Sequence, residues 1–362
     1  MATLTLIGEP FPDADLVASL TAVQDLALAL AGSTPRGCGV EMLVGRTSTP
    51  PELNHPKLAV QRMQLPASAL PVMWQSGTAA RSLDGALVHS LTAMAPLRSR
   101  EDDSQSTVTI PHALPWEAPE CMPGQTARLM RAFTRRAMRH ADLIITPTHA
   151  VAEVLRGVYG SNAPIRVVPL AAPSSFLRPK DADARRTALG LPERYILTSA
   201  SQAEHCRLDW ILDALEASPE LPDLVVLGTP PEAKGAEEAP ARPRLDGRVH
   251  YVSVDEQDNV GVAISGALLL VQPQISVGSG YVEHGALAQG VPILHASIAG
   301  TAEIALDGGV AFTDAADLVR TLNELCSNES ARGRLALLAE DRGRTFTWRS
   351  TAWHLWELHA DL

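Results

Sequence analysis

The sequence has few cysteines, no long apolar run and no metal-binding motif. Its 362 residues include four cysteines, none in a CxxC pair. This spacing argues against a disulfide framework and against a structural zinc site. No apolar run approaches the roughly 20 residues that span a bilayer. The N-terminus lacks the basic flank, apolar stretch and cleavage site of a signal peptide. We therefore expect a cytoplasmic protein.

Positive charge is also scarce. There are 30 Lys and Arg residues against 41 Asp and Glu residues, and the formal net charge is −11. A net-acidic chain binds nucleic acid poorly unless its basic residues cluster, so no nucleic-acid partner is expected. Apolar residues make up 46% and charged residues 20%, which excludes wholesale disorder. At roughly 100–200 residues per domain, the length predicts two domains.

Short apolar runs alternate with helical patterns along the chain. The predicted strands are 3–7, 40–44, 85–89, 107–110, 143–146 and 166–169, then 195–199, 223–227, 249–252, 267–271, 292–295 and 310–312. The main helical patterns are 16–31, 126–140 and 148–159, then 208–216, 280–288 and 315–325. Most strands are apolar on both faces, which is typical of buried parallel strands. The alternation predicts an α/β fold with two doubly wound, Rossmann-like domains.

A change in amino-acid composition marks the boundary between these domains. Pro169, Pro173 and Pro179 punctuate a polar segment. We read 1–172 as the N-terminal domain, 173–192 as a linker and 193–345 as the C-terminal domain. A stretch at 232–244, rich in Pro, Ala and Glu, indicates a surface insertion. Ligands of such folds bind at the carboxyl ends of the strands, so the default site is a cleft across which the domains face each other.

Several stretches in a fixed order carry a family resemblance. They are ADLIITPTHAVAEVL at 141–155 with RVVPLA at 166–171, YILTSAS at 195–201, and GVPIL at 290–294 followed by GGVAF at 308–312. Together they resemble the family-4 retaining glycosyltransferases of the GT-B fold. The tail FTWRSTA at 346–352 is similar to the family's last segment, so 346–362 is expected to form a helix crossing back to the N-terminal domain. The resemblance covers most of the chain from Val88 onward.

The resemblance implies an activity. It is retaining, metal-independent transfer of a sugar from a nucleotide-sugar donor to a polysaccharide or lipid-linked glycan acceptor. The nucleotide-diphosphate sugar is the donor substrate, and no cofactor is implied. Negative charge grows on the diphosphate as its bond to the sugar breaks, and Arg, Lys and backbone N–H groups stabilise that charge. The AspXAsp triplets at 13–15 and 181–183 lie in a loop and the linker, so no metal is expected.

The chain departs from the family pattern in both domains. A glycine-rich turn near 17–22 has no glycine, and Pro111–His112 stand where the family has a His-Asp pair. His205–Cys206 stand at the Arg-Lys pair that holds the diphosphate. Val277 and Gly285 stand at two glutamates that contact the transferred sugar and the ribose.

These departures leave a second hypothesis open. The chain can be a catalytically degenerate GT-B protein that acts as structural or regulatory partner of an active glycosyltransferase. An epimerase or phosphorylase of the same fold is a third possibility. Glu283 lies about 200° around a helix from Gly285, so we expect it to point away from the position of the missing glutamate.

Two loops of the C-terminal domain are candidates for donor binding. Backbone N–H groups at the start of a predicted helix can cradle a phosphate, and a guanidinium forms a fork that suits a diphosphate. The candidate donor residues are Ser201, His205, Arg207, Gly278, Ser279, Gly280 and Tyr281. The alternatives are an ordinary strand-to-helix turn and a solvated arginine.

Two histidines are candidates on the acceptor side. His112 follows a buried strand in a proline-rich loop, where the family's acceptor-side residues lie. Histidine titrates near neutrality and so suits proton transfer, which makes His112 the catalytic candidate. His89 ends another strand and can face the cleft. The alternatives are a histidine bonded to backbone and a histidine of the core.

One predicted helix carries a basic stripe. Arg128, Arg131, Arg135 and Arg139 are spaced by three, four and four residues and so share one helical face, with Arg136 beside them. On an acidic protein this face can contact anionic lipid headgroups, which implies peripheral attachment at the inner face of the membrane, or an acidic protein partner. A solvated helix face is the alternative.

Overall fold

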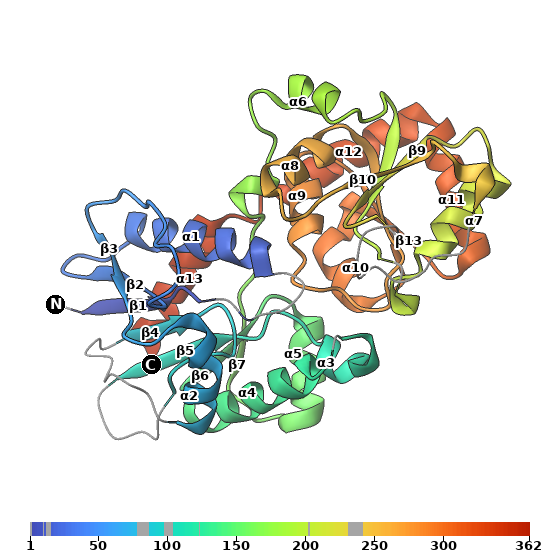
Figure 1. The fold of residues 1–362 in the computed structure, drawn as a ribbon. Coiled ribbons are helices and arrows are strands. Elements are labelled where there is room, and N and C mark those ends of the chain that lie inside the picture. Colours follow the sequence, from blue (N-terminus) through green and yellow to red (C-terminus); the bar gives the residue numbers. More distant parts are fainter. Residues whose placement is uncertain are drawn as a thin grey trace. The chain divides into compact units, whose positions relative to one another are not determined.

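The computed structural model describes residues 2–9, 11, 16–77, 87–97, 104–122, 124–201, 203–230 and 242–362. These form two compact units (Figure 1): unit 1 is Met1–Ala171 with Thr347–Leu362, and unit 2 is Ala172–Phe346. Part of the predicted strand 85–89, most of the predicted insertion 232–244 and the AspXAsp triplet at 13–15 lie outside the described residues.

Unit 1 contains a parallel sheet of seven strands in the order β3-β2-β1-β4-β5-β6-β7. The strands are β1 (Thr3–Ile7), β2 (Gly39–Val44), β3 (Leu58–Arg62), β4 (Leu87–Ser90), β5 (Gln105–Thr109), β6 (Leu143–Thr146) and β7 (Ile165–Val167). Its helices are α1 (Leu16–Gly32), α2 (Leu70–Ser76), α3 (Leu114–Glu117), α4 (Thr126–His140), α5 (His149–Tyr159) and α13 (Trp348–Asp361). The prediction missed β3, because this edge strand is largely exposed and has no apolar run.

The last helix of the chain, α13, completes unit 1. It packs on α1, and the indole N–H of Trp356 donates to the Leu30 carbonyl over 3.2 Å. The Thr351 hydroxyl donates to the Pro169 carbonyl over 2.7 Å. A buried indole N–H usually needs a hydrogen-bond acceptor, and Leu30 supplies one here. The two hydrogen bonds therefore fix α13 to α1 and to the chain after β7.

Unit 2 contains a parallel sheet of six strands in the order β10-β9-β8-β11-β12-β13. The strands are β8 (Tyr195–Thr198), β9 (Asp223–Leu227), β10 (Val249–Val252), β11 (Ala267–Gln272), β12 (Ile293–Ala296) and β13 (Gly309–Phe312). Its helices are α6 (Ala182–Ala188), α7 (Leu208–Ala217), α8 (Gln257–Ser265), α9 (Tyr281–Ala288), α10 (Ala299–Ala305), α11 (Ala315–Ser327) and α12 (Glu329–Gly343). The prediction missed α8, α10 and α12. Helix α12 exposes Leu337 and Leu338 and so lacks a clean apolar stripe.

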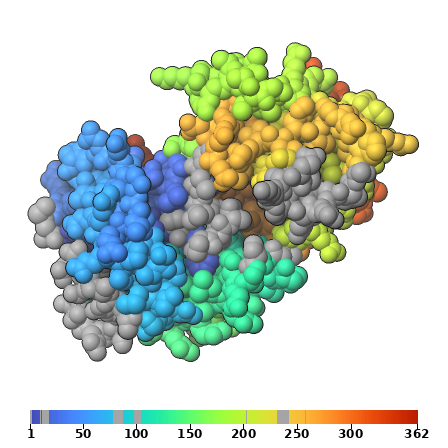
Figure 2. Space-filling model, in the orientation of Figure 1, coloured from blue at the N-terminus to red at the C-terminus, as the bar shows by residue number. Residues whose placement is uncertain are grey.

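The segment 173–192, expected as a linker, packs on unit 2. Phe176 is buried, and its carbonyl accepts a hydrogen bond of 2.7 Å from the Gln289 side chain. Helix α6 lies against α8, where Arg185 donates to Asn259 over 3.0 Å. Figure 2 shows this yellow-green segment on the surface of unit 2. The division between the units therefore falls at Ala171, before the proline-rich segment ends.

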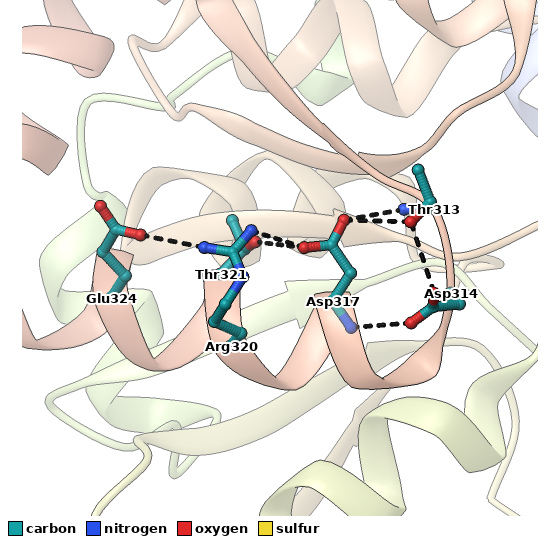
Figure 3. A network of polar contacts seen from close by, with 6 residues as sticks. All are labelled: Thr313, Asp314, Asp317, Arg320, Thr321 and Glu324. Carbon is teal, nitrogen blue, oxygen red and sulfur yellow. Dashed lines mark hydrogen bonds and ion pairs between the residues drawn. The ribbon is translucent and has the colours of Figure 1, made fainter.

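A reciprocal capping network starts α11 at the end of β13 (Figure 3). The Asp314 carboxylate accepts from the Asp317 N–H over 2.9 Å, and Asp317 accepts from the Thr313 N–H over 3.0 Å. The two bonds differ from a capping box only in that Asp317 reaches the N–H one residue before the N-cap. Arg320 pairs with Asp317 and with Glu324. The hydrogen bonds from Arg320 and from the Thr313 N–H lower the pKa of Asp317.

Candidate functional site

The carboxyl ends of β8 and β11 form the centre of the candidate site in unit 2. These two strands are neighbours, while β9 follows β8 on one side and β12 follows β11 on the other. Such a reversal of strand order opens a crevice at the carboxyl ends of the two strands, where doubly wound folds bind ligands. The Ile275 N–H, after β11, donates to the His205 carbonyl, after β8, over 3.1 Å. The two loops predicted to bind the donor are therefore joined.

A polar side-chain network lies at this point. The Gln272 side-chain amide donates over 2.8 Å both to the Ser199 hydroxyl and to the Glu283 carboxylate. The Gln274 side-chain amide donates to the Ser199 hydroxyl over 3.3 Å and to the side-chain oxygen Oε1 of Gln272 over 3.1 Å. Gln272 and Glu283 are buried. The network joins β8, β11 and α9 and presents a carboxylate at the centre of the sheet.

Sequence reasoning missed this network. The sequence predicts only that Glu283 points away from the position of Gly285 on the helix. In the structure, a Cβ on Gly285 would lie 3.0 Å from Ile264 and 3.3 Å from the Phe176 Cβ, so that face of α9 is packed. Glu283 is on the face turned to the ends of the strands. The signal that could have found it is that Ser199 and Gln272 both end strands that become neighbours.

Val277, at the other family glutamate position, is also packed. Its side chain lies against Gly300, where an added Cβ would be 2.5 Å from the Val277 Cγ1. Val277 is 9% exposed. Position 277 therefore supplies packing against the start of α10.

The glycine turn at 278–280 leads into α9. Gly280 is the N-cap with φ 74°, a left-handed conformation that glycine adopts without strain. A Cβ there would lie 2.8 Å from the Ile304 Cδ1. Ser279 and Tyr281 are buried, whereas Gly278 is exposed. The turn therefore brings the first N–H groups of α9 to the carboxyl edge of the sheet, where they can meet an anion.

The loop after β8 carries the other candidate donor residues. Ser201 is exposed, and its hydroxyl donates to the Cys206 sulfur over 3.3 Å. His205 is half-buried in the short turn before α7. Arg207 is the N-cap of α7, and its guanidinium lies over the Trp210 ring, 4.6 Å from the centroid.

In unit 1, His89 lies inside the molecule. Its ring is fully buried in β4, and Nδ1 is 2.8 Å from the Thr107 hydroxyl. The same hydroxyl is 3.2 Å from Nε2 of His359 on α13. Burial, and then the nearby His359, lower the pKa of His89 to about 3, and burial lowers the pKa of His359 to about 4. Both imidazoles are therefore neutral at pH 7, and the Thr107 hydroxyl of β5 joins His89 of β4 to His359 of α13.

His112 lies at the carboxyl end of β5. It is buried and directly precedes Ala113, the N-cap of α3. The Trp116 ring of α3 meets the Tyr159 ring edge to face, with centroids 6.2 Å apart. The loop that carries His112 is therefore held by packing as well as by the sheet.

His284 is a buried polar residue of α9 that the sequence did not single out. Its ring stacks on Phe346 with centroids 4.4 Å apart and planes at 19°. Arg342 lies 4.5 Å from the centroid of the same Phe346 ring. Burial, and then the Arg342 charge, lower the pKa of His284 to about 3. Among the described residues, no group hydrogen-bonds to its Nδ1.

The basic stripe lies on α4. Arg128, Arg135 and Arg139 are exposed and Arg131 is half-buried. None of these four forms an ion pair with a residue that the structure describes. Arg136, expected beside them, is turned inward and donates to the Leu97 carbonyl over 2.6 Å. The opposite face of α4 is buried through Met130, Phe133 and Ala137.

The described part of the chain contains no group of three or more His, Cys, Asp or Glu side chains arranged to hold a metal ion. None of its helices has the length and apolar character needed to cross a membrane.

Comparisons with known proteins give relatives in sequence. The model of Glycosyltransferase Family 4 matches residues 21–176. The D-inositol 3-phosphate glycosyltransferase of a Nocardioides species is 26% identical over 237 residues, which cover 59% of this chain and 52% of that protein. The protein of the same name from Nocardia farcinica is 25% identical over 250 residues, covering 62% and 55%. The chain thus spans about half the length of these curated relatives.

Solved structures share the whole fold. Sucrose-phosphate synthase from Thermosynechococcus elongatus superposes with a TM-score of 0.75 at 19% identity, covering 100% of this chain and 99% of that one. HepE from Anabaena, solved with UDP-glucose, gives 0.69 at 15% identity and covers both chains fully, at 100% each. WaaG, a glycosyltransferase of lipopolysaccharide biosynthesis, gives 0.65 at 15%, covering 98% and 99%. Residues 21–176 therefore match Glycosyltransferase Family 4, and the shared architecture shows that the chain has the GT-B fold.

Proposed function

We propose that this chain is a retaining, metal-independent hexosyltransferase. It would move a sugar from a nucleotide-sugar donor to a polysaccharide or lipid-linked glycan. One observation carries the proposal: the loops that lead to the Gly280 turn and to Arg207 are joined at the ends of β8 and β11. The polar network that contains Glu283 lies at the same strand ends. The solved complex of HepE with UDP-glucose supports the donor class.

In this proposal the donor diphosphate binds at the start of α9. The N–H groups of Gly278, Ser279 and Gly280 and the fork of Arg207 bind its oxygens, with Ser201, His205 and Tyr281 lining the site. The Glu283 carboxylate accepts hydrogen bonds from hydroxyl groups of the donor, because a carboxylate has several acceptor positions. As the bond from sugar to phosphate breaks, the N–H groups and the guanidinium stabilise the charge of the leaving diphosphate.

On the acceptor side we assign contact to His112, at the carboxyl end of β5. There it would exchange a proton with the attacking hydroxyl or position it. We assign no acceptor contact to His89, because its ring is enclosed by Thr107 and the sheet.

A second function keeps the fold without catalysis, as a structural or regulatory partner of an active glycosyltransferase. The packing of Val277 on Gly300 and of position 285 on Phe176 favours it. An apolar residue cannot accept a hydrogen bond from a sugar hydroxyl. The loss of such a contact typically raises the activation barrier by about 2–4 kcal/mol. A donor site can survive in such a protein, so donor binding and turnover must be measured separately.

The basic stripe of α4 supports peripheral attachment to an anionic membrane surface, with an acidic protein partner as the other outcome. Arg128, Arg135 and Arg139 are exposed on one helical face and are not neutralised by a described carboxylate. Each basic residue near an anionic surface contributes about 1 kcal/mol at low ionic strength. A lipid-linked acceptor would be reached from such a surface.

The test is a calorimetric titration of the chain with uridine, guanosine and adenosine diphosphates and with their glucose and mannose conjugates. Micromolar binding of one donor, weakened at least tenfold by Arg207→Ala, would support the site. Incubation of that donor with acceptor glycans, with the anomer of the product read by NMR, then separates a retaining enzyme from the alternative. Binding without product would favour the partner function, and no binding by folded protein would refute the donor site.

A further inference from the structure

We propose that Trp210 is a positioning residue that holds the Arg207 guanidinium for a nucleoside diphosphate, so that the pair sets the preference of the site for diphosphate over monophosphate. The inference rests on the proposed donor site and deepens it. It is carried by the backbone at 207, by the stacking on Trp210 and by the place of this pair in the fold.

The backbone at Arg207 has an unusual conformation. Its φ is 51° and its ψ 36°, and among the described residues only Leu306 is another non-glycine with positive φ. This left-handed region is disfavoured for side chains with a Cβ, and glycine or asparagine adopts it more readily. Arg207 is the N-cap of α7, yet its side chain caps no N–H group. The local fold therefore does not explain an arginine at this position.

The Arg207 side chain is fixed by an aromatic contact. Its guanidinium carbon lies 4.6 Å from the centroid of the Trp210 ring, within the range of a cation–π interaction. Trp210 in turn packs against Phe312, with ring centroids 6.4 Å apart. Phe312 is fully buried at the end of β13, so the indole rests on the core of unit 2. Arg207 is therefore held by Trp210, and Trp210 is held by Phe312.

This arrangement leaves the edge of the guanidinium available. Arg207 forms no ion pair with any carboxylate in the described ranges, and it is half-buried. Stacking uses the face of a guanidinium and leaves its N–H fork in the plane, where it can bind two phosphate oxygens. An arginine ordered before the ligand arrives loses less side-chain entropy on binding.

The position of the pair matches a diphosphate. Arg207 directly follows the turn of Glu204–Cys206, which is joined to the loop after β11 through the Ile275 N–H and the His205 carbonyl. That loop leads to Gly280 and the first N–H groups of α9. A diphosphate can place one phosphate at the start of α9 and the other at Arg207, whereas a monophosphate offers only one group.

The experiment compares four proteins: the wild type, Arg207→Asn, Trp210→Phe and Trp210→Leu. Asparagine tolerates the left-handed backbone, so Arg207→Asn removes the guanidinium without adding strain. Phenylalanine keeps an aromatic face under Arg207 and leucine does not. Each protein is titrated with uridine, guanosine and adenosine diphosphates and with the matching monophosphates. The readout is the ratio of the two dissociation constants, with thermal unfolding as a check of the fold.

We expect the wild type to bind its preferred diphosphate at least tenfold more tightly than the monophosphate. Arg207→Asn should reduce this ratio to threefold or less, Trp210→Leu should reduce it several-fold, and Trp210→Phe should keep most of it. If Trp210→Leu weakens both nucleotides equally, Trp210 is only structural and the inference is wrong. An unchanged ratio in Arg207→Asn also overturns it, while the donor site stands. If the folded wild type binds no nucleotide, the donor site itself fails, and the inference fails with it.

Discussion

The side-chain amide of Gln272 donates a hydrogen bond of 2.8 Å to the carboxylate of Glu283, which joins the end of the central strand β11 to helix α9. Glu283 is 6% exposed. A buried carboxylate is stable only where hydrogen bonds satisfy it. The carboxylate therefore lies at a defined place beside the candidate site, and it can be tested there.

Glu283→Gln should weaken donor binding by about fivefold to tenfold, because a neutral amide accepts a hydrogen bond from a hydroxyl group less strongly than a carboxylate does, by about 1–1.5 kcal/mol. Stability should change little, since the amide still accepts from Gln272. Calorimetric titration with the preferred nucleotide sugar measures the loss. Glu220→Gln, at an exposed carboxylate, is the matched control and should bind as the wild type does. Equal affinity in both variants would remove Glu283 from the site.

Gly280→Val should impair the start of α9. The added Cβ would lie 2.8 Å from the Ile304 Cδ1, in a backbone with φ 74° that a β-branched residue does not tolerate. We expect a loss of about 1–3 kcal/mol in unfolding free energy and a loss of donor affinity. Urea denaturation and titration measure the two effects. Gly333→Ala, at a position with no atom within 4 Å of the new Cβ, should instead stabilise α12 by about 0.5–1 kcal/mol.

Acidification should destabilise the protein through its buried histidines. The pKa of His284 falls from 6.5 to about 3 on folding, so the unfolded chain binds a proton between these values that the folded chain does not. This contribution to stability is complete above pH 6.5 and is lost progressively as the pH falls toward 3. Linkage gives a loss of about 1.4 kcal/mol per such histidine at pH 5.5.

Urea denaturation at pH 7.5 and pH 5.5 tests this pH dependence. His284→Gln should reduce the difference between the two pH values by about 1.4 kcal/mol, because glutamine does not titrate. His354→Gln, at an exposed position, should leave the difference unchanged. An equal pH response of the wild type and His284→Gln would contradict the assignment of a neutral, buried imidazole.

Replacement of the three exposed arginines of α4 by alanine should weaken binding to vesicles that contain phosphatidylserine. The variant is Arg128→Ala, Arg135→Ala and Arg139→Ala together. At about 1 kcal/mol each, the expected loss is about a hundredfold at low ionic strength. The charge-matched control replaces Arg178, Arg320 and Arg344, which are exposed but paired with carboxylates. Co-sedimentation that is equal in both triple variants would refute the membrane surface and leave an acidic protein as the partner to seek.

Asp314→Ala should remove the cap of α11. The Asp314 carboxylate accepts from the Asp317 N–H, and loss of such a cap costs about 0.5–2 kcal/mol. A fall in the midpoint of thermal unfolding should accompany unchanged affinity for nucleotide. Asp314→Asn should retain most of the stability, because its amide oxygen can cap the same N–H group.

The alternation of strands and helices could be predicted because parallel strands buried on both faces are short apolar runs. Strands β1, β6, β9 and β10 have the predicted bounds. Strand β3 could not be predicted, because it is an exposed edge strand whose position depends on its pairing with β2. Helix α12 could not either, since Leu337 and Leu338 face outward and blur its pattern.

The candidate site shows a similar division. Gly280 could be placed before a helix because a glycine ahead of a helical pattern indicates a turn. The sequence predicts that Glu283 points away from the position of Gly285. Its contact with Gln272 could not be predicted, because that depends on which side of α9 packs on Phe176 and Ile264. The stacking of Arg207 on Trp210 needs only i, i+3 spacing, yet the left-handed backbone of Arg207 has no signature in the sequence.

The chain enters unit 2 shortly before Phe176 and leaves it after Phe346, and both residues contact α9, through Gly285 and Gln289 in one case and through His284 in the other. Helix α9 therefore packs against both segments through which the chain enters and leaves unit 2. A substitution that shifts α9 would disturb the packing of both segments, those of Phe176 and of Phe346, at once.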